Sequence, residues 1–191
     1  MQKNLNKKQA IEKAYRTILH FTTSHDRYDE ELERTPQRAA EGILEMLRGY
    51  NKPNFKMTTF PTTYQGMLVR DSIPFSSVCA HHIIPYIGVA HIGIIYDGRK
   101  LGLSKFIRAI QHWSAILSSQ EELTQTIVEK FDSLLKPKGV IVVMTANHLC
   151  EAIRGIRVPN VATTTSWFSG AFEKHETRSE FYEELKLRGV R

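Results

Sequence analysis

The feature of this sequence that most constrains its fold is a change in hydrophobic pattern at about residue 52. In residues 4–20 apolar side chains recur at helical spacing, for example at Ile11, Ala14 and Ile18. After the NKPNF segment, residues 64–78 (YQGMLVRDSIPFSSV) and 86–103 (YIGVAHIGIIYDGRKLGL) have strand-like patterns. The sequence therefore predicts an N-terminal helical arm over residues 1–52, followed by a domain over residues 53–191.

The second domain is predicted to combine antiparallel strands with a pair of helices. Asp97-Gly98 is typical of a hairpin turn between two strands. Residues 104–117 and 118–135 have helical patterns, whereas residues 139–150 (GVIVVMTANHLC) are typical of a buried strand and residues 161–172 of a further strand. This arrangement predicts a two-layer α+β fold.

Four helix starts are predicted from capping residues. Thr35 is expected to cap a helix with Pro36 at its first position, and Ser104 is expected to cap the next helix. Capping boxes are predicted where a hydroxyl residue precedes a glutamate by three positions. The residue pairs are Ser119 with Glu122 and Thr177 with Glu180.

The composition limits the possible partners. No apolar run is long enough to span a bilayer and the first ten residues are polar, so a cytoplasmic protein without membrane contact is expected. The net charge of +6 over 191 residues favours an anionic partner, either nucleic acid or a small phosphorylated molecule. Because the basic residues are scattered rather than clustered, nucleic acid is the less favoured of the two.

Both cysteines of the chain lie close to a histidine. Cys79 and His82 have the spacing of two metal ligands from one turn, and His148 and Cys150 fall on the same face of a strand. Thiolate and imidazole together suit zinc. Three ligands, Cys79, His82 and Cys150, would leave an open catalytic position, whereas addition of His148 or His81 would give a closed structural site. Two buried cysteines beside ordinary histidines are the remaining interpretation.

An ordered set of segments resembles the GTP cyclohydrolase I family. The resemblance covers about residues 35–185 and is carried by TPQRAAEGILEML, VRDSIPFSSVCAHHIIP, GLSKFIRAI, QEELT, NHLCEAIRGIR, ATTTS and TRSEF. It implies a T-fold (tunnelling fold), with a four-stranded antiparallel sheet, two helices on one face and an N-terminal helical hairpin. It also implies a homodecamer of two stacked toroids, with active sites between subunits.

The resemblance further implies an activity and its residues. The family converts GTP and water into formate and 7,8-dihydroneopterin triphosphate, and Cys79, His82 and Cys150 match its zinc ligands. His148 matches the histidine that shuttles a proton at the purine imidazole ring, and His81 matches a second catalytic histidine that assists ring opening. The remaining matches are substrate-binding positions. They are Gln120 and Glu121 for the guanine edge, and Lys105, Arg108 and Arg154 for the triphosphate, with Ser104 in the same segment as Lys105.

The sequence also departs from the family pattern at four positions. Ala80 stands where the family usually has Glu, Glu122 replaces an Arg, and Ile116 and Ser118 lie in a segment that is usually richer in Arg and Gln. A divergent enzyme that opens another purine nucleotide, or that stops at the ring-opened formamide, is therefore an alternative. A non-catalytic zinc module that binds nucleic acid is a less favoured one, because no DNA-binding motif is recognised. The sequence does not distinguish folate, biopterin and deazapurine pathways for the product.

Overall fold

The computed structural model describes residues 6–23, 30–51 and 56–189. The chain divides into two compact units, residues 1–48 and residues 49–191. The boundary expected at residues 52/53 falls within 52–55, outside the described residues. No helix in the described part of the chain is long and apolar enough to cross a membrane.

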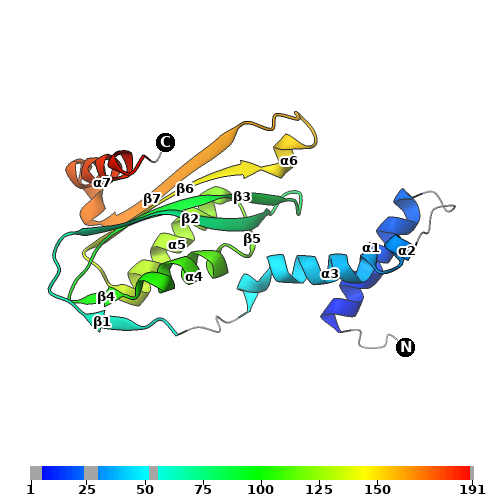
Figure 1. Cartoon of the computed structure of the whole chain (residues 1–191), viewed down its shortest axis with the longest axis horizontal. Helices are drawn as coiled ribbons and strands as arrows, with labels where there is room; N and C mark the ends of the chain where they lie inside the picture. The colour runs from blue at the N-terminus through cyan, green and yellow to red at the C-terminus, as the bar shows by residue number, and fades with distance from the viewer. Residues whose placement is uncertain (1–5, 24–29, 52–55, 190–191) are drawn as a thin grey trace. The chain divides into compact units, whose positions relative to one another are not determined.

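The first unit is helical, as predicted (Figure 1). Helix α1 spans Lys7–Thr22, the short α2 spans Glu30–Glu33, and α3 spans Thr35–Met46. Helices α1 and α3 pack together, and an ion pair of 2.6 Å joins Lys8 Nζ to Glu41 Oε1. The prediction of Thr35 as a cap is wrong by one position, because Arg34 is the capping residue and makes no side-chain bond there.

The second unit is built on a sheet of five strands. Four of them run antiparallel in the order β2 (Met67–Cys79), β3 (Pro85–Ile95), β6 (Gly139–His148) and β7 (Ala162–Gly170). The two-residue strand β5 (Leu117–Ser118) adds a short parallel pairing beside the end of β2. This sheet confirms the α+β class and the four antiparallel strands expected of the T-fold.

The predicted hairpin at Asp97-Gly98 is wrong. The chain does turn there, with Gly98 at φ +70°, a value that glycine adopts without strain. The strand that follows, β4 (Arg99–Leu101), does not return alongside β3, however. It pairs with β1 (Thr59–Pro61) to form a separate two-stranded sheet.

Helices cover both faces of the large sheet (Figure 1). Helices α4 (Leu103–Trp113) and α5 (Gln120–Leu135) lie on one face, and α7 (His175–Leu187) lies on the other. Strand β6 shows why this works, since its alternate side chains are buried on opposite sides. Val142 packs into the core with Phe131 of α5, whereas Ile141 packs into the core with Phe181 of α7.

Short helices complete the fold, and the helix caps differ in part from those predicted. The remaining elements are η2 (Arg48–Tyr50), α6 (Leu149–Ala152) and η3 (Ala171–Glu173). Ser119 caps α5 as predicted, because its side chain accepts a hydrogen bond of 3.2 Å from the Glu122 N–H, but the return bond of a capping box, from the Ser119 N–H to the Glu122 side chain, is not among those of the described residues. The predicted caps Ser104 and Thr177 are wrong, because α4 and α7 begin earlier, after Gly102 and Lys174.

Candidate metal and catalytic site

The three predicted metal ligands form a cluster at one end of the sheet. One ligand atom from each of Cys79, His82 and Cys150 lies within 4.8 Å of the other two. Both cysteines are buried, whereas His82 is exposed. Two thiols and one imidazole are a donor set that suits zinc, and three protein donors leave a coordination position for water or substrate. The residues present therefore fit a catalytic zinc ion.

The local chain path explains how Cys79 and His82 meet. Cys79 is the last residue of β2. Its N–H donates to the Ile84 carbonyl oxygen, and its carbonyl oxygen accepts from the Ile83 N–H, each at 2.9 Å. This tight turn, with Ile83 at φ +55°, folds the chain back so that His82 Nδ1 lies 3.7 Å from the Cys79 Sγ. His81 Nδ1 lies at the same distance from that sulfur.

Cys150 reaches the same place from another strand. It is the second residue of α6, which follows directly after β6. Strands β2 and β6 both run antiparallel to β3, which lies between them. Their C-terminal ends therefore lie at the same end of the sheet. Burial raises the pKa of the Cys150 thiol, and so does the neighbouring Cys79. A bound cation favours the thiolate and opposes this shift.

His148 is held on two sides. Its ring stacks on that of Tyr86, with centroids 4.5 Å apart and planes at 9°. Its Nε2 lies 2.9 Å from Gln120 Oε1. Gln120 itself is buried at the start of α5, and its amide nitrogen contacts oxygen atoms of both β6 and β7. The predicted catalytic histidine is therefore fixed by neighbours in β3 and α5.

A cavity of about 220 Å³ brings most of the predicted residues together. The predicted metal ligands, His81, His148, Gln120 and Glu121 all line it. Four further lining residues were not among those predicted: Ser118, Ser119, Glu151 and Thr163. Ser118 is also one of the four departures from the family pattern. The position of Glu151 beside Cys150 in the sequence is a signal that could have identified it.

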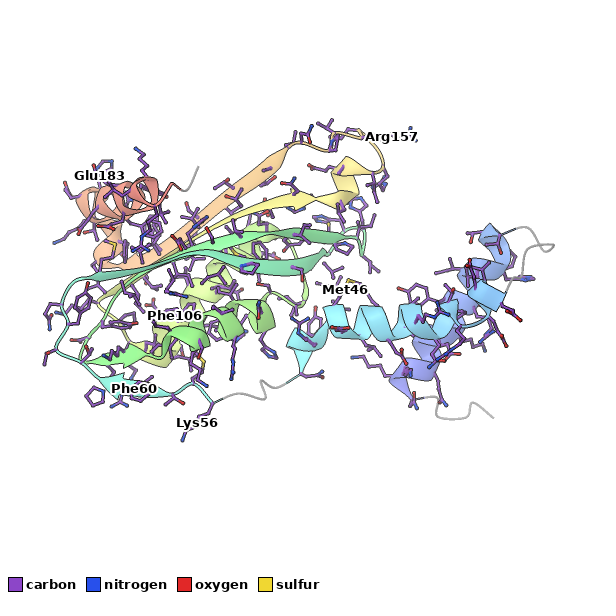
Figure 2. All side chains as sticks on the ribbon, viewed as in Figure 1. Met46, Lys56, Phe60, Phe106, Arg157 and Glu183 are labelled. Atoms are coloured by element: carbon purple, nitrogen blue, oxygen red, sulfur yellow. The ribbon has the colours of Figure 1, made fainter. Side chains whose placement is uncertain are left out.

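The predicted triphosphate binders lie elsewhere. In the described part of the chain, Ser104, Lys105, Arg108 and Arg154 do not line this cavity. The first three belong to α4, which follows β4, whereas the cavity is lined by Cys150 and Glu151 of α6. Figure 2 labels Phe106 on α4 and Arg157 just beyond α6, and the two are well separated along the sheet. Arg154 lies shortly after α6 and is exposed.

Only one of the four departures from the family pattern is in the cavity wall. Ser118 lines the cavity and is buried. Ala80 is exposed in the turn between the two ligands Cys79 and His82. Ile116 packs against the core, and Glu122 is exposed on the first turn of α5.

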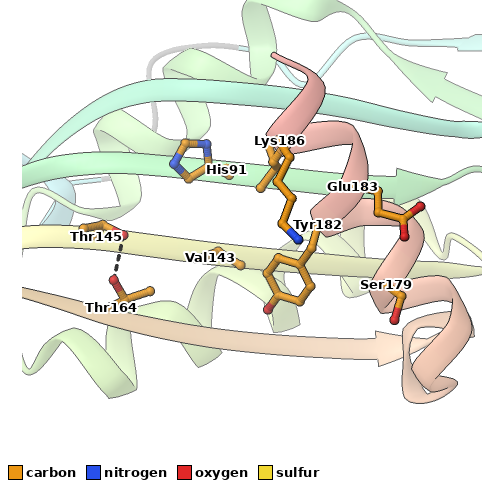
Figure 3. Close-up of a pocket in the computed structure, with 9 residues that line it drawn as sticks. His91, Val143, Thr145, Thr164, Ser179, Tyr182, Glu183 and Lys186 are labelled. Atoms are coloured by element: carbon orange, nitrogen blue, oxygen red, sulfur yellow. Dashed lines mark hydrogen bonds between the residues drawn. The ribbon is translucent and has the colours of Figure 1, made fainter. Parts of the chain in front are cut away.

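A larger cavity, of about 580 Å³, lies on the other face of the sheet (Figure 3). Residues of α7, including Tyr182 and Lys186, lie over His91 of β3 and Thr145 of β6. None of the predicted site residues lines this cavity. The larger of the two cavities is therefore separate from the Cys–His cluster.

Comparisons with known proteins identify the family. The model of the GTP cyclohydrolase I family matches residues 11–186. GTP cyclohydrolase 1 of Bacteroides fragilis (strain YCH46) is 37% identical over 177 residues, which cover 91% of each chain. GTP cyclohydrolase 1 of Porphyromonas gingivalis is 41% identical over 155 residues, which cover 80% of each chain.

A solved structure, archaeosine synthase QueF-Like in the apo form, matches with a TM-score of 0.45 and 17% identity, and the match covers 58% of this chain and 98% of that one. The family match extends over most of the chain and includes every residue of the cavity. The chain belongs to the GTP cyclohydrolase I family of enzymes.

Proposed function

We propose that this protein is a zinc-dependent GTP cyclohydrolase I that converts GTP into formate and 7,8-dihydroneopterin triphosphate. One observation carries the proposal. Three metal-ligand atoms, from Cys79, His82 and Cys150, lie within 4.8 Å of one another in a cavity that also contains two further histidines. Cavities that combine a metal-ligand cluster with proton-transfer groups are typical of hydrolytic metal sites.

Zinc held by the two cysteines and His82 would act as a Lewis acid and lower the pKa of a bound water molecule. Hydroxide would then be available at neutral pH. The donor set supports zinc over harder cations, because thiolates are soft ligands. The three ligands line the cavity together with His81, whose Nδ1 lies 3.7 Å from the Cys79 sulfur.

The chain's own residues would bind the base and move protons. His148 is proposed to exchange a proton at the imidazole ring of guanine, and His81 to assist ring opening, because imidazole transfers protons efficiently near neutral pH. Glu121 is exposed in the cavity, where its carboxylate can accept hydrogen bonds from the N1–H and 2-amino groups of guanine.

The triphosphate is proposed to bind Ser104, Lys105, Arg108 and Arg154. Arginine forks suit phosphate oxygens, and lysine adds a point charge. Because Lys105 and Arg108 lie away from the cavity of their own chain, the proposal requires a neighbouring copy to supply them to each site. This supports a homo-oligomer, a decamer on the family pattern, in which the active sites lie between subunits.

A second candidate is an enzyme that opens the purine ring but does not complete the later rearrangement. It is favoured by Ser118, which departs from the family pattern and lies in the cavity wall, and by Ala80, which departs between two metal ligands.

The test is incubation of the zinc-supplied protein with GTP, with formate and pterin measured separately. Formate and a fluorescent pterin in equal amounts, both absent from a Cys150→Ser variant, are the expected result. Formate without pterin would support the second candidate. Neither product from protein that contains one zinc per chain would refute both. Zinc content is measured in the same samples, and zinc in the variant is expected to fall well below one per chain.

A further inference from the structure

We propose that Gln120 is a positioning residue that orients His148, rather than a residue that holds the guanine edge. The argument starts from the partners of the Gln120 amide nitrogen. Nε2 lies 2.9 Å from the Met144 carbonyl oxygen and 3.0 Å from the Thr163 carbonyl oxygen. Carbonyl oxygens only accept hydrogen bonds, so the amide must present its NH₂ group to them.

The hydroxyl groups of Thr124 and Thr165 require the same orientation of the Gln120 amide, by a separate argument. Thr124 Oγ1 donates to the main-chain carbonyl oxygen of Gln120 at 2.7 Å. Its own hydrogen is thereby used, so Thr165 Oγ1 must donate to Thr124 Oγ1 across 2.6 Å. Thr165 Oγ1 then accepts at 3.1 Å from Gln120 Nε2. Both amide hydrogens of Gln120 are therefore taken by the protein, and none is left for a base.

The amide oxygen must then face His148. Gln120 Oε1 lies 2.9 Å from His148 Nε2, and an amide oxygen can only accept. His148 must therefore carry a hydrogen on Nε2. In the neutral ring this leaves Nδ1 as the nitrogen with a free lone pair. Among the described residues, the imidazole ring of His148 makes no other hydrogen bond.

The surroundings make this orientation rigid. The side chain of Gln120 is only 1% exposed, and the Tyr86 ring covers one face of the imidazole. The backbone atoms that hold Gln120 belong to β6 and β7, and Gln120 itself begins α5. The sheet and the helix layer together therefore determine which imidazole nitrogen of His148 exchanges protons. Nδ1 is assigned this task.

The first test reads the tautomer directly and does not depend on any activity. Magic-angle-spinning NMR of ¹⁵N-histidine-labelled protein distinguishes N–H from bare nitrogen in neutral imidazole. The same spectra show whether the ring is neutral, because an imidazolium carries a hydrogen on both nitrogens. The His148 signals are identified by their loss in a His148→Asn variant. The expected result is a hydrogen on Nε2 in the wild type and a mixture of both tautomers in Gln120→Met. A hydrogen on Nδ1 in the wild type, or no change in the variant, would overturn the proposal.

The second test is kinetic and rests on the proposed function. Gln120→Met is expected to lower kcat on the order of 10- to 100-fold, with little change in the affinity for GTP. Its matched control is Gln125→Met, the same change on the exposed face of the same helix, which is expected to leave both constants unaltered. An increase in the dissociation constant for GTP at unchanged kcat would instead indicate a guanine reader.

A double-mutant cycle separates positioning from direct contact. If Gln120 acts through His148, Gln120→Met should reduce the residual rate very little once His148 is already Asn. Effects that multiply fully in the double variant would overturn the proposal. Because Gln120→Met leaves carbonyl groups without a donor, Gln120→Glu serves as a second variant. Its neutral acid form keeps an oxygen toward His148, so Nε2 should stay protonated and part of kcat should return. The NMR result stands even if the protein has no activity on GTP, so the two failures are distinguishable.

Discussion

Tyr86 and His148 are direct partners across strands β3 and β6, and their rings lie almost parallel with centroids 4.5 Å apart. Tyr86 is completely buried, so the ring of the candidate catalytic histidine packs against a residue of the hydrophobic core. The orientation of His148 therefore depends on core packing as well as on its hydrogen bond to Gln120.

Removal of the Tyr86 ring is expected to affect both stability and activity. Tyr86→Leu should lower the free energy of unfolding by about 2–4 kcal/mol, because it leaves a cavity in the core. It should also lower kcat, because the His148 ring loses its support. Tyr86→Phe is the matched control, since it keeps the stacked ring and loses the hydroxyl, which contacts the Ser118 carbonyl oxygen at 3.5 Å and the Ser77 side chain. Urea unfolding and steady-state kinetics measure the two effects. An equal loss of kcat in both variants would contradict this explanation.

The burial of the Tyr86 phenol also leads to a prediction of how the free energy of unfolding changes at alkaline pH. Burial raises the pKa of its phenol to about 12. Since the folded-state pKa lies above the ordinary value of about 10, folding favours the neutral phenol. Its contribution, at most roughly 2–3 kcal/mol, should be complete below pH ~10 and lost as the pH rises towards 12. Tyr96, whose pKa burial also raises to about 12, should act in the same direction.

Urea unfolding between pH 8 and 12 (about two units either side of the ordinary phenol pKa) checks the alkaline prediction. Tyr86→Phe should make the decline shallower without abolishing it, because Tyr96 remains. A decline that is identical in the wild type and the variant would show that Tyr86 does not contribute.

The proposed role of Glu121 predicts a specific pattern of substrate discrimination. Its carboxylate should bind the 2-amino group of guanine, which inosine triphosphate lacks. Glu121→Gln is therefore expected to lower kcat/KM for GTP by roughly 10- to 100-fold, the value of one charged hydrogen bond, and to change it much less for inosine triphosphate. Glu122→Gln is the control on the next residue, which is exposed outside the cavity. Equal losses for both nucleotides in Glu121→Gln would exclude recognition of the 2-amino group.

Two glycines offer a matched test of packing. A Cβ on Gly88 of β3 would lie 2.7 Å from the Ala146 Cα of β6, where the backbone cannot move without disturbing the sheet. Gly88→Ala should therefore destabilise the protein by about 1–3 kcal/mol. Gly42 lies within α3, and a Cβ there would meet nothing within 4 Å. Gly42→Ala should stabilise its helix by roughly 0.5–1 kcal/mol. Thermal unfolding of both variants measures the changes, and destabilisation by Gly42→Ala would contradict the packing argument.

Much of the fold follows from local sequence, and the exceptions have physical causes. The buried strand over residues 139–148 was predictable because four consecutive β-branched residues, 140–143, form its centre. The partner of β4 was not, because an Asp-Gly turn specifies a local reversal but not which strand the next segment joins. The start of α7 also escaped prediction, since two hydroxyl–glutamate pairs have the same spacing but only Ser119 lies outside its helix.

In the site too, contacts within one turn could be predicted from the sequence, whereas hydrogen bonds between distant segments could not. Cys79 and His82 are three residues apart, so their proximity could be predicted from a single turn. Cys150 joined the predicted set as the second cysteine close to a histidine, and the family resemblance matched the same three residues to zinc ligands. The engagement of the Gln120 amide could not be predicted. It depends on Met144, Thr163 and Thr165, which lie on two strands that only the folded sheet brings to the start of α5.

The turn after β2 and the end of β6 have a further consequence for the apo protein. A metal ion held by Cys79 and Cys150 would close the intervening chain, with β3, α4, α5 and β6, into a ring. Such a link reduces the number of conformations open to the unfolded chain, as a disulfide does. Loss of the ion would therefore reopen this ring, and unlike a disulfide the link could form and break reversibly in a reducing environment.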